Sequence, residues 1–217
     1  PVLLNETLWG LGTNIYVMVL SRQGTEEYSA YTIFTTIEQL LYVFFKGLCH
    51  AAAILIGKAS GRGDNDEAYK LAKKFLIITP LTAVITGIII AFLRAPILSM
   101  FAIETQRTKE IASSILLTYC LIIGARMIPY TAICGIFRAG GDVKTGCIYE
   151  LVCLYFICIP SVYIAGMLLH VPFTLLVPIM FVSEDLPKLI LCLRHFIKRN
   201  WIRKLTDSDA VSGTDNN

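Results

Sequence analysis

The residues with the clearest chemical potential are charged side chains inside long apolar stretches: Glu6, Glu38, Lys46, Arg126 and Glu184. A charge at the middle of a bilayer costs at least ~2.5 kcal/mol, so such groups persist mainly where they face a polar pathway or a partner. Carboxylates and cations in that setting can bind and release ions or recognise charged solutes. The pattern therefore predicts transport machinery.

Glu6 lies in a run dominated by Val, Leu, Trp and Gly, with Asn5 beside it and Trp9 close by. A carboxyl in a low-dielectric setting resists ionisation, so its protonation can be coupled to the arrival of a cation. The alternative is an acid near the cytoplasmic interface, because Glu6 lies close to the start of the sequence. We favour the functional interpretation, since intramembrane acids are candidate sites by default.

Glu38, Tyr42 and Lys46 follow one another at i, i+4 spacing in the second apolar stretch, which gives them an approximately common helix face. Lys46 falls near the middle of that stretch. It could snorkel only partway to the interface, so a partner acid or a wet cavity is expected. The alternative is an internal charge pair that holds helices together.

Arg126 lies close to Pro129 and Tyr130 in the fourth stretch. A proline frees a backbone carbonyl and bends a helix, and such discontinuities recur at transport sites. The alternative is an ordinary proline kink with a structurally paired arginine.

The last stretch carries Glu184, Asp185 and Lys188. Glu184 and Lys188 have the favourable i, i+4 order, which neutralises one acid and leaves one carboxylate to be explained. We expect a role in packing the helices more than direct contact with a substrate.

The elements that must position these residues are six membrane-spanning helices, so the predicted fold class is all-α integral membrane. Hydrophobic residues make up 55% of the 217 residues, charged residues 16%, and the mean hydropathy is +0.65, which is too apolar for a soluble domain. The expected domain covers 1–205, followed by a disordered cytoplasmic tail at 206–217. The predicted spans are roughly 1–20, 31–57, 71–95, 108–137, 146–169 and 172–197.

Lysine and arginine in the loops and at the ends predict the orientation. With both chain ends in the cytoplasm, the outside collects Arg22, Arg94, Arg107 and Lys109. The inside collects a larger set: Lys58, Arg62, Lys70, Lys73, Lys74, Arg138, Lys144, Arg194, Lys198, Arg199, Arg203 and Lys204. Trp201 among the terminal basic residues suits an anchor at the headgroup level. We therefore expect a multi-pass protein that lies in the plasma or inner membrane.

Several other functions are disfavoured. The chain has no Walker A loop, no GxSxG and no metal-ligand cluster, so we expect no enzyme activity and no cofactor. The basic residues are not interleaved with aromatics in one patch, which argues against a nucleic-acid partner. The seven cysteines read as free thiols. Energy for transport would come from an ion gradient or another subunit.

The loop strings resemble the multidrug and toxic compound extrusion (MATE) transporters, specifically their carboxy-terminal six-helix lobe. PVLLNETLWGLG, ILIGKASGRGDNDEAYKLAKKF, GIFRAGGDVK and RHFIKRNWIRKL occur in the order and spacing of that lobe. The resemblance covers about the first 205 residues. It implies one lobe of a twelve-helix transporter, whose partner would be an amino-terminal six-helix lobe missing from this sequence.

The resemblance also implies a mechanism. Family members exchange Na+ or H+ for amphipathic, often cationic, organic compounds by rocking two lobes around a central cleft. Glu6 matches the acid of the family's LNE-type segment, and Glu184 resembles an acid often found in the last helix. Sodium-coupled members of one branch also use an acid in the fourth helix of this lobe, whereas nothing acidic lies between Glu110 and Asp142 here.

The sequence leaves two alternatives to export. The first is a lipid-linked oligosaccharide flippase of the same superfamily, because Lys46 and Arg126 could face anionic head groups. The second is a membrane fragment that does not transport, because alternating access needs two sets of helices moving against each other.

Overall fold

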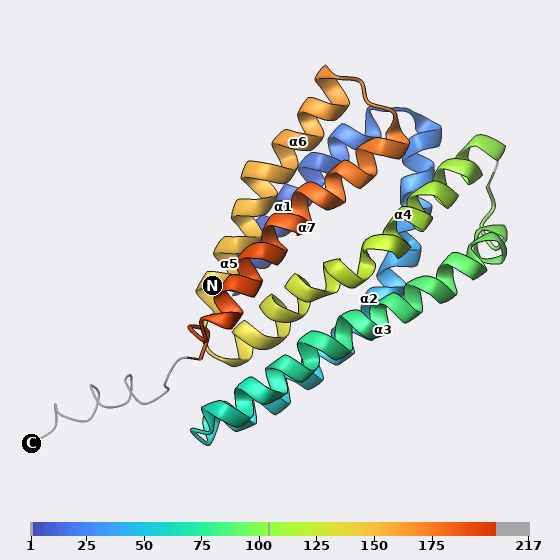
Figure 1. Ribbon diagram of the computed structural model, residues 1–217. Helices are drawn as coiled ribbons and strands as arrows, with labels where there is room; N and C mark the ends of the chain where they lie inside the picture. The colour runs from blue at the N-terminus through green and yellow to red at the C-terminus, as the bar shows by residue number, and fades with distance from the viewer. Residues whose placement is uncertain (1, 104, 203–217) are drawn as a thin grey trace, which may run out of the picture.

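The computed structural model describes residues 2–103 and 105–202, and this part of the chain is helical (Figure 1). Gly141 and Ile202 form an isolated antiparallel bridge. The all-α prediction is therefore confirmed for the described residues, whereas the predicted tail lies outside them, as do Arg203 and Lys204. The elements are α1 (Val2–Ser21), α2 (Thr25–Gly61), α3 (Asn65–Ser99), α4 (Gln106–Tyr130), η1 (Thr131–Phe137), α5 (Val143–Val152), η2 (Cys153–Cys158), α6 (Ile159–Tyr163), η3 (Ile164–Leu168) and α7 (Phe173–Ile197).

Among residues 2–103 and 105–202, four helical segments are long and apolar enough to cross a membrane: Thr25–Gly61, Asn65–Ser99, Gln106–Phe137 and Val143–Leu168. α1 and α7 are outside this set; α1 carries Asn5, Glu6 and Asn14, and three charged residues lie close together in α7. The chain is thus a multi-pass helical membrane protein. That 1–20 and 172–197 also cross the bilayer, and that the helices form one lobe, stay predictions.

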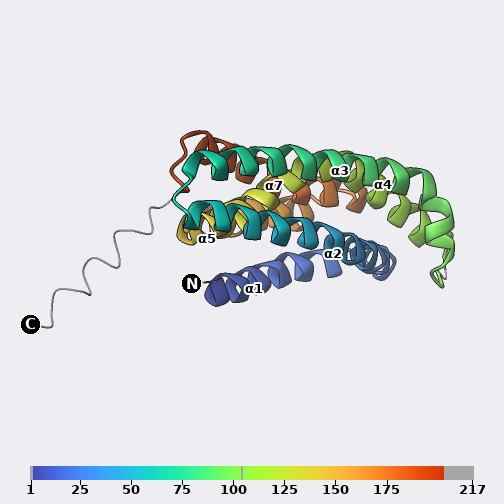
Figure 2. The ribbon, with the colours of Figure 1, turned by 90° about the horizontal axis from the view of Figure 1, so that it is seen from below.

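The helices alternate in direction, so the loops gather at two opposite ends (Figures 1 and 2). The amino-terminal end of α1 lies at the same end of the molecule as the α2–α3 and η1–α5 connections and the end of α7. The loops that contain Gln23, Phe101 and His170 lie at the other end. We call the first the basic end, because ten of the described lysines and arginines lie there: Lys58, Arg62, Lys70, Lys73, Lys74, Arg138, Lys144, Arg194, Lys198 and Arg199.

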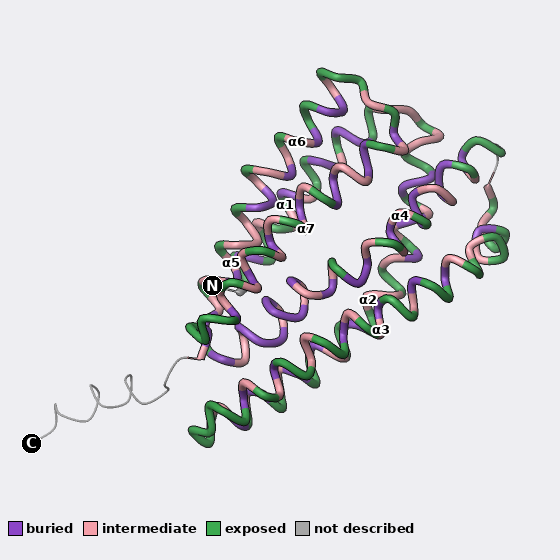
Figure 3. Tube along the Cα trace, in the orientation of Figure 1, coloured by how far each residue is buried: buried purple, intermediate pink, exposed green. Residues whose placement is uncertain are grey.

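The outer surfaces of α2 and α3 are largely exposed and apolar (Figure 3). On α3, large hydrophobic side chains are half or more exposed at Ile77, Leu81, Ile85, Ile88 and Phe92. A contiguous apolar surface of this kind is unfavourable in water and marks a membrane or protein interface. We interpret it as the lipid-facing side.

Local sequence explains several helix boundaries and one close contact. Asp64 caps α3 by accepting a hydrogen bond from the Glu67 N–H at 2.9 Å, and Thr105 caps α4. Gly87 allows α3 and α4 to approach closely, because a Cβ there would lie 2.8 Å from the carbonyl oxygen of Cys120. Small residues serve this purpose in membrane helix packing.

The predicted discontinuity in the fourth helix is present. Pro129 lies inside α4, and the π-helical turn η1 follows it directly. Proline lacks the N–H that would bond the carbonyl four residues earlier, at Ala125, so the regular hydrogen-bond ladder is interrupted beside Arg126. π-helical turns occur frequently at functional sites.

Trp201 is fully buried, so the expected headgroup anchor is wrong. Its ring stacks on Phe196 with centroids 6.0 Å apart, and Phe196 stacks in turn on Tyr69 of α3 at 5.2 Å. Gly140 provides the space, because a Cβ there would lie 2.4 Å from the indole ring. Arg199 lies over the Tyr69 ring at 4.0 Å. Sequence alone could not show this, because Tyr69 and Gly140 lie far from Trp201 in the chain.

We expect Trp201→Ala to destabilise the fold by ~3–5 kcal/mol, because it removes a large buried aromatic side chain that links α3, α7 and the η1–α5 loop. Trp9→Ala is the matched control, since the Trp9 side chain is 39% exposed. Thermal unfolding of the full transporter in detergent measures both. Equal melting temperatures for the two variants would contradict the proposed packing role.

Candidate functional site

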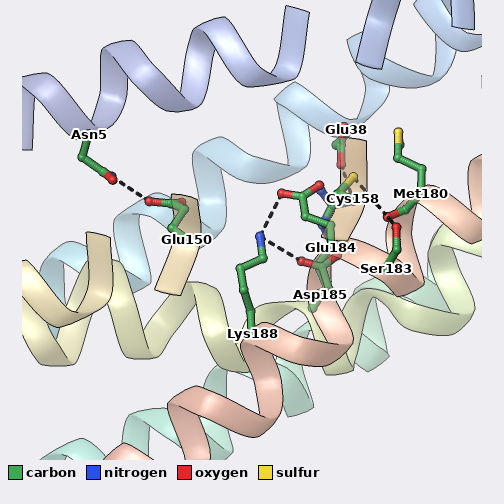
Figure 4. Close-up of polar contacts among 10 residues, drawn as sticks. Asn5, Glu38, Glu150, Cys158, Met180, Ser183, Glu184, Asp185 and Lys188 are labelled. Carbon is green, nitrogen blue, oxygen red and sulfur yellow. Dashed lines mark hydrogen bonds and ion pairs between the residues drawn. The ribbon is translucent and has the colours of Figure 1, made fainter. Parts of the chain in front are cut away.

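A network of buried charges joins α2, α4 and α7 in the interior of the bundle (Figure 4). The Arg126 guanidinium contacts the carboxylate of Glu38 at 3.2 Å and that of Asp185 at 3.2 Å. Lys188 contacts Glu184 at 2.8 Å and Asp185 at 3.5 Å. These five side chains, here called the charge network, are each at least four-fifths buried.

The structure shows a partner for Asp185, the acid of α7 that the Glu184–Lys188 spacing left unpaired. Glu184 pairs with Lys188, as the i, i+4 spacing predicts, while Asp185 turns toward Arg126 on α4. Three carboxylates and two cations give the network a formal charge of −1 when all five groups are ionised. An uncompensated buried charge is costly, so the arrangement favours the uptake of one positive charge.

Aromatic side chains hold Arg126 in place. Phe34, Tyr119 and Phe181 form a cluster with ring centroids 5.1 to 5.9 Å apart, contributed by α2, α4 and α7. The Arg126 guanidinium lies 4.7 Å from the Phe181 centroid and 5.8 Å from that of Tyr119. Cation–π contact stabilises an arginine in a dry setting and fixes its planar group.

A small cavity of about 140 Å³ lies between α4 and α7 beside the network. Arg126 and Asp185 contribute its polar groups, and its remaining walls are Ile122, Ala125, Phe181, Val182, Leu186 and Leu189. An apolar cavity with two opposite charges in its wall can accommodate a small amphipathic group or a few waters.

A second polar cluster lies nearer the basic end. Glu6 pairs with Arg138 at 2.6 Å, and Asn5 donates a hydrogen bond to Glu150 on α5 at 2.7 Å. The Glu6 side chain is 53% exposed, whereas Asn5 is 2% exposed. Glu6 therefore belongs to a rim of the described chain, where its charge is matched by Arg138, and it is separate from the charge network.

The remaining predicted site residues, Tyr130, Trp9 and Lys46, lie outside both polar clusters. Tyr130 packs edge-on against Tyr42 of α2 with centroids 5.2 Å apart, one turn from Arg126. Trp9 is partly exposed on α1. Lys46 is exposed and forms no ion pair with any residue that the structure describes, so the expected partner acid is absent there. The structure thus brings Glu38, Arg126 and Glu184 together, and leaves Lys46 and Trp9 apart.

Sequence reasoning missed Glu150, Arg138 and the pair formed by Asp142 and His195, which approach to 2.7 Å. Glu150 has the same signal as Glu6, since it is an acid close to an apolar run. Among residues 2–103 and 105–202, no three His, Cys, Asp or Glu side chains are grouped to hold a metal ion.

Long apolar helices packed around a buried charge network define the chain as a polytopic helical membrane protein with a candidate ion or solute site. The family model described as MatE matches residues 1–164. The chain therefore belongs to the MatE family.

Curated relatives agree with this assignment. The chain is 30% identical over 139 residues to the multidrug and toxin extrusion protein 1 of Xenopus tropicalis, which covers 63% of the chain and 24% of that protein. It is 24% identical over 198 residues to the uncharacterized transporter YisQ of Bacillus subtilis, which covers 90% of the chain and 42% of that protein. The chain thus spans less than half the length of these relatives.

A solved structure shows the same fold. A MOP superfamily transporter from Pyrococcus furiosus superposes with a TM-score of 0.74 at 17% sequence identity. The match covers 94% of the chain and 45% of that structure.

We expect Arg126→Leu to destabilise the protein by ~3–5 kcal/mol, because it leaves the buried carboxylates of Glu38 and Asp185 without their shared cation. Arg107→Leu is the matched control, since Arg107 is 68% exposed and its ion pairs with Glu26 and Glu27 are worth ~0–1 kcal/mol. Unfolding of the full transporter in detergent measures both.

The double variant Arg126→Leu with Asp185→Asn should recover part of the loss, because one of the stranded charges is removed together with its partner. A single Arg126→Leu variant as stable as Arg107→Leu would show that the network is not buried in the folded protein.

Proposed function

We propose that this chain forms half of an ion-driven antiporter that exports small amphipathic or cationic organic compounds. Three observations support the proposal: membership of the MatE family, a relative named for multidrug and toxin extrusion, and a buried network with an unbalanced charge. The second half would be an amino-terminal set of helices in the same transporter. The protein would lie in the plasma or inner membrane with the basic end in the cytoplasm, as the distribution of lysine and arginine suggests.

The charge network is the observation that carries the proposal. Its three acids and two bases leave one negative charge that a coupling ion can neutralise. Arg126 contacts Glu38 on α2 and Asp185 on α7, so neutralising either acid changes which helices the arginine holds together. In this mechanism the arrival of a cation weakens one helix contact and favours the other orientation of the transporter, which couples the ion to the solute.

Glu6 and Glu184, the two acids carried over from the family resemblance, take different roles in this proposal. Glu184 is part of the charge network. Glu6 lies at the rim with Asn5 and within the same helix as Trp9, where it would meet cationic solutes or close against the second half of the transporter. The coupling ion is Na+ or H+, and no tightly bound cofactor is proposed.

The flippase alternative is not favoured, because one relative is named for multidrug and toxin extrusion and another is named a probable multidrug resistance protein. Arg126, which suggested an anionic head group, is already matched by two carboxylates. Lys46 remains available, but it is exposed on α2 and separate from the network.

The sharpest test is Glu38→Gln in the full transporter. This change leaves two balanced pairs, Arg126 with Asp185 and Lys188 with Glu184, so the fold should persist while the unbalanced charge is lost. We expect ion-driven efflux of ethidium to fall by at least about tenfold, which corresponds to 1.4 kcal/mol in the barrier. Efflux from loaded proteoliposomes under an imposed H+ or Na+ gradient is the measurement.

Glu110→Gln is the matched control, because Glu110 is an exposed acid in the first turns of α4, outside the charge network. Unchanged gradient dependence in Glu38→Gln would remove the charge network from the coupling mechanism. An absence of efflux from the intact protein under either gradient would instead support the transport-inactive alternative.

A further inference from the structure

The outer side of α3 changes from lysine to apolar side chains along a single stripe. Its exposed positions follow one another at intervals of three or four residues, which places their side chains on one side of the helix. The stripe begins with Lys70 and Lys74 and continues with residues of the lipid-facing side: Ile77, Leu81, Ile85, Ile88 and Phe92. Lys73 is exposed at its edge. We call Lys70, Lys73 and Lys74 the lysine face.

The dimensions of α3 and of a bilayer agree with this change. Lys74 and Arg94 are about 30 Å apart along α3 at about 1.5 Å per residue, which matches the thickness of a hydrocarbon core. Lys74 therefore lies at one boundary of the core when the apolar stripe faces lipid. Lys70 lies about 6 Å further toward the basic end, within a headgroup layer about 5–7 Å thick. The lysine face is thus at the depth of the lipid headgroups.

The acids of the α2–α3 connection do not neutralise the lysine face. Glu67 pairs with Arg62 at 2.9 Å, and Asp66 pairs with Arg199 at 3.1 Å. Asp64 accepts a hydrogen bond from the Glu67 N–H as the cap of α3. None of the three lysines forms an ion pair with a residue that the structure describes. Three positive charges therefore remain for a partner outside the described chain.

The adjacent end of α2 carries the same pattern. Its exposed residues include Ile54 and Leu55 and then Lys58, less than one turn before the helix ends at Gly61. Lys58 also forms no ion pair within the described ranges. α2 and α3 lie side by side up to their connection (Figures 1 and 2). Lysine therefore marks the basic end of the lipid-facing surface on both helices.

We propose that the lysine face, together with Lys58 of α2, binds the headgroups of anionic phospholipids while their acyl chains lie along the apolar stripe of α3. Ammonium groups attract the negative charge of these lipids, and each lysine near a membrane surface strengthens binding to anionic lipid about fivefold. The apolar stripe contacts the acyl chains, which a soluble phosphate compound lacks. The partner is therefore a lipid with net negative charge in the leaflet at the basic end.

The experiment measures lipid binding by the full transporter in a non-ionic detergent. The probe is phosphatidylglycerol with a fluorophore on an acyl chain, and fluorescence anisotropy gives its affinity. We expect the triple variant Lys70→Gln, Lys73→Gln, Lys74→Gln to weaken binding by at least about tenfold, because three unpaired charges are removed. The corresponding phosphatidylcholine probe should bind the variant and the wild type equally. The melting temperature should stay within a few degrees, since all three side chains are exposed.

Two further variants separate the lysine face from net charge. Arginine at the same three positions should keep the phosphatidylglycerol affinity within about threefold, because the charge is retained. The charge-matched control replaces three cations outside the α2–α3 hairpin with glutamine, and its affinity should stay within about twofold of the wild type. These cations are Arg22, Lys109 and Lys144. Glycerol 3-phosphate, which has the phosphate but no acyl chains, should displace the probe only in large excess.

Three outcomes would overturn the proposal. Equal phosphatidylglycerol affinity in the wild type and the glutamine triple variant would exclude the lysine face from lipid binding. An equal loss in the charge-matched control would show that only the net charge of the protein matters. Displacement by glycerol 3-phosphate at the concentration of the lipid would assign the lysine face to a soluble phosphate compound. Because no arm of the experiment depends on transport, each of these results would leave the proposed antiport standing.

Discussion

The fold depends on the pairing of five charged side chains away from water. Glu38, Arg126, Glu184, Asp185 and Lys188 come from three helices, and each side chain of the network is at least four-fifths buried. An isolated ion in a low-dielectric interior costs several kcal/mol, so these helices can pack together only in a register that pairs opposite charges. The ion contacts therefore select one arrangement of α2, α4 and α7 among the many that apolar packing would allow.

Aromatic rings, a glycine and a proline next to the charge network support the same packing of α2, α4 and α7. The rings of Phe34, Tyr119 and Phe181 enclose the Arg126 guanidinium, and Gly87 lets α3 lie close against α4. Pro129 and the π-helical turn after it interrupt the backbone ladder one turn away from the arginine. In the proposed transporter this irregular part of the fourth helix would serve as a hinge, because the interrupted ladder offers less resistance to bending.

The two polar clusters differ in their surroundings, and this difference gives them different roles in the proposed transporter. The pair formed by Glu6 and Arg138 is accessible at one end, where salt and solutes weaken it. The charge network is enclosed, so a single added charge changes its energy far more. The curated relatives are more than twice as long as the chain, and in the proposed full transporter the exposed cluster would face the remaining helices.

The sequence alone determined the class of protein, because long apolar runs with isolated charges can be satisfied only by helices in a membrane. It also predicted the Glu184–Lys188 pair and the interruption at Pro129, since both follow from spacing within one helix. Only the tertiary structure decided which charges meet: Arg126 with Glu38 and Asp185, Glu6 with Arg138, and Asn5 with Glu150. It also showed that Trp201 is buried and that Lys46 stands apart. Helical periodicity fixes the face of one helix but not the rotation and register of its neighbours, and contacts between helices depend on all three.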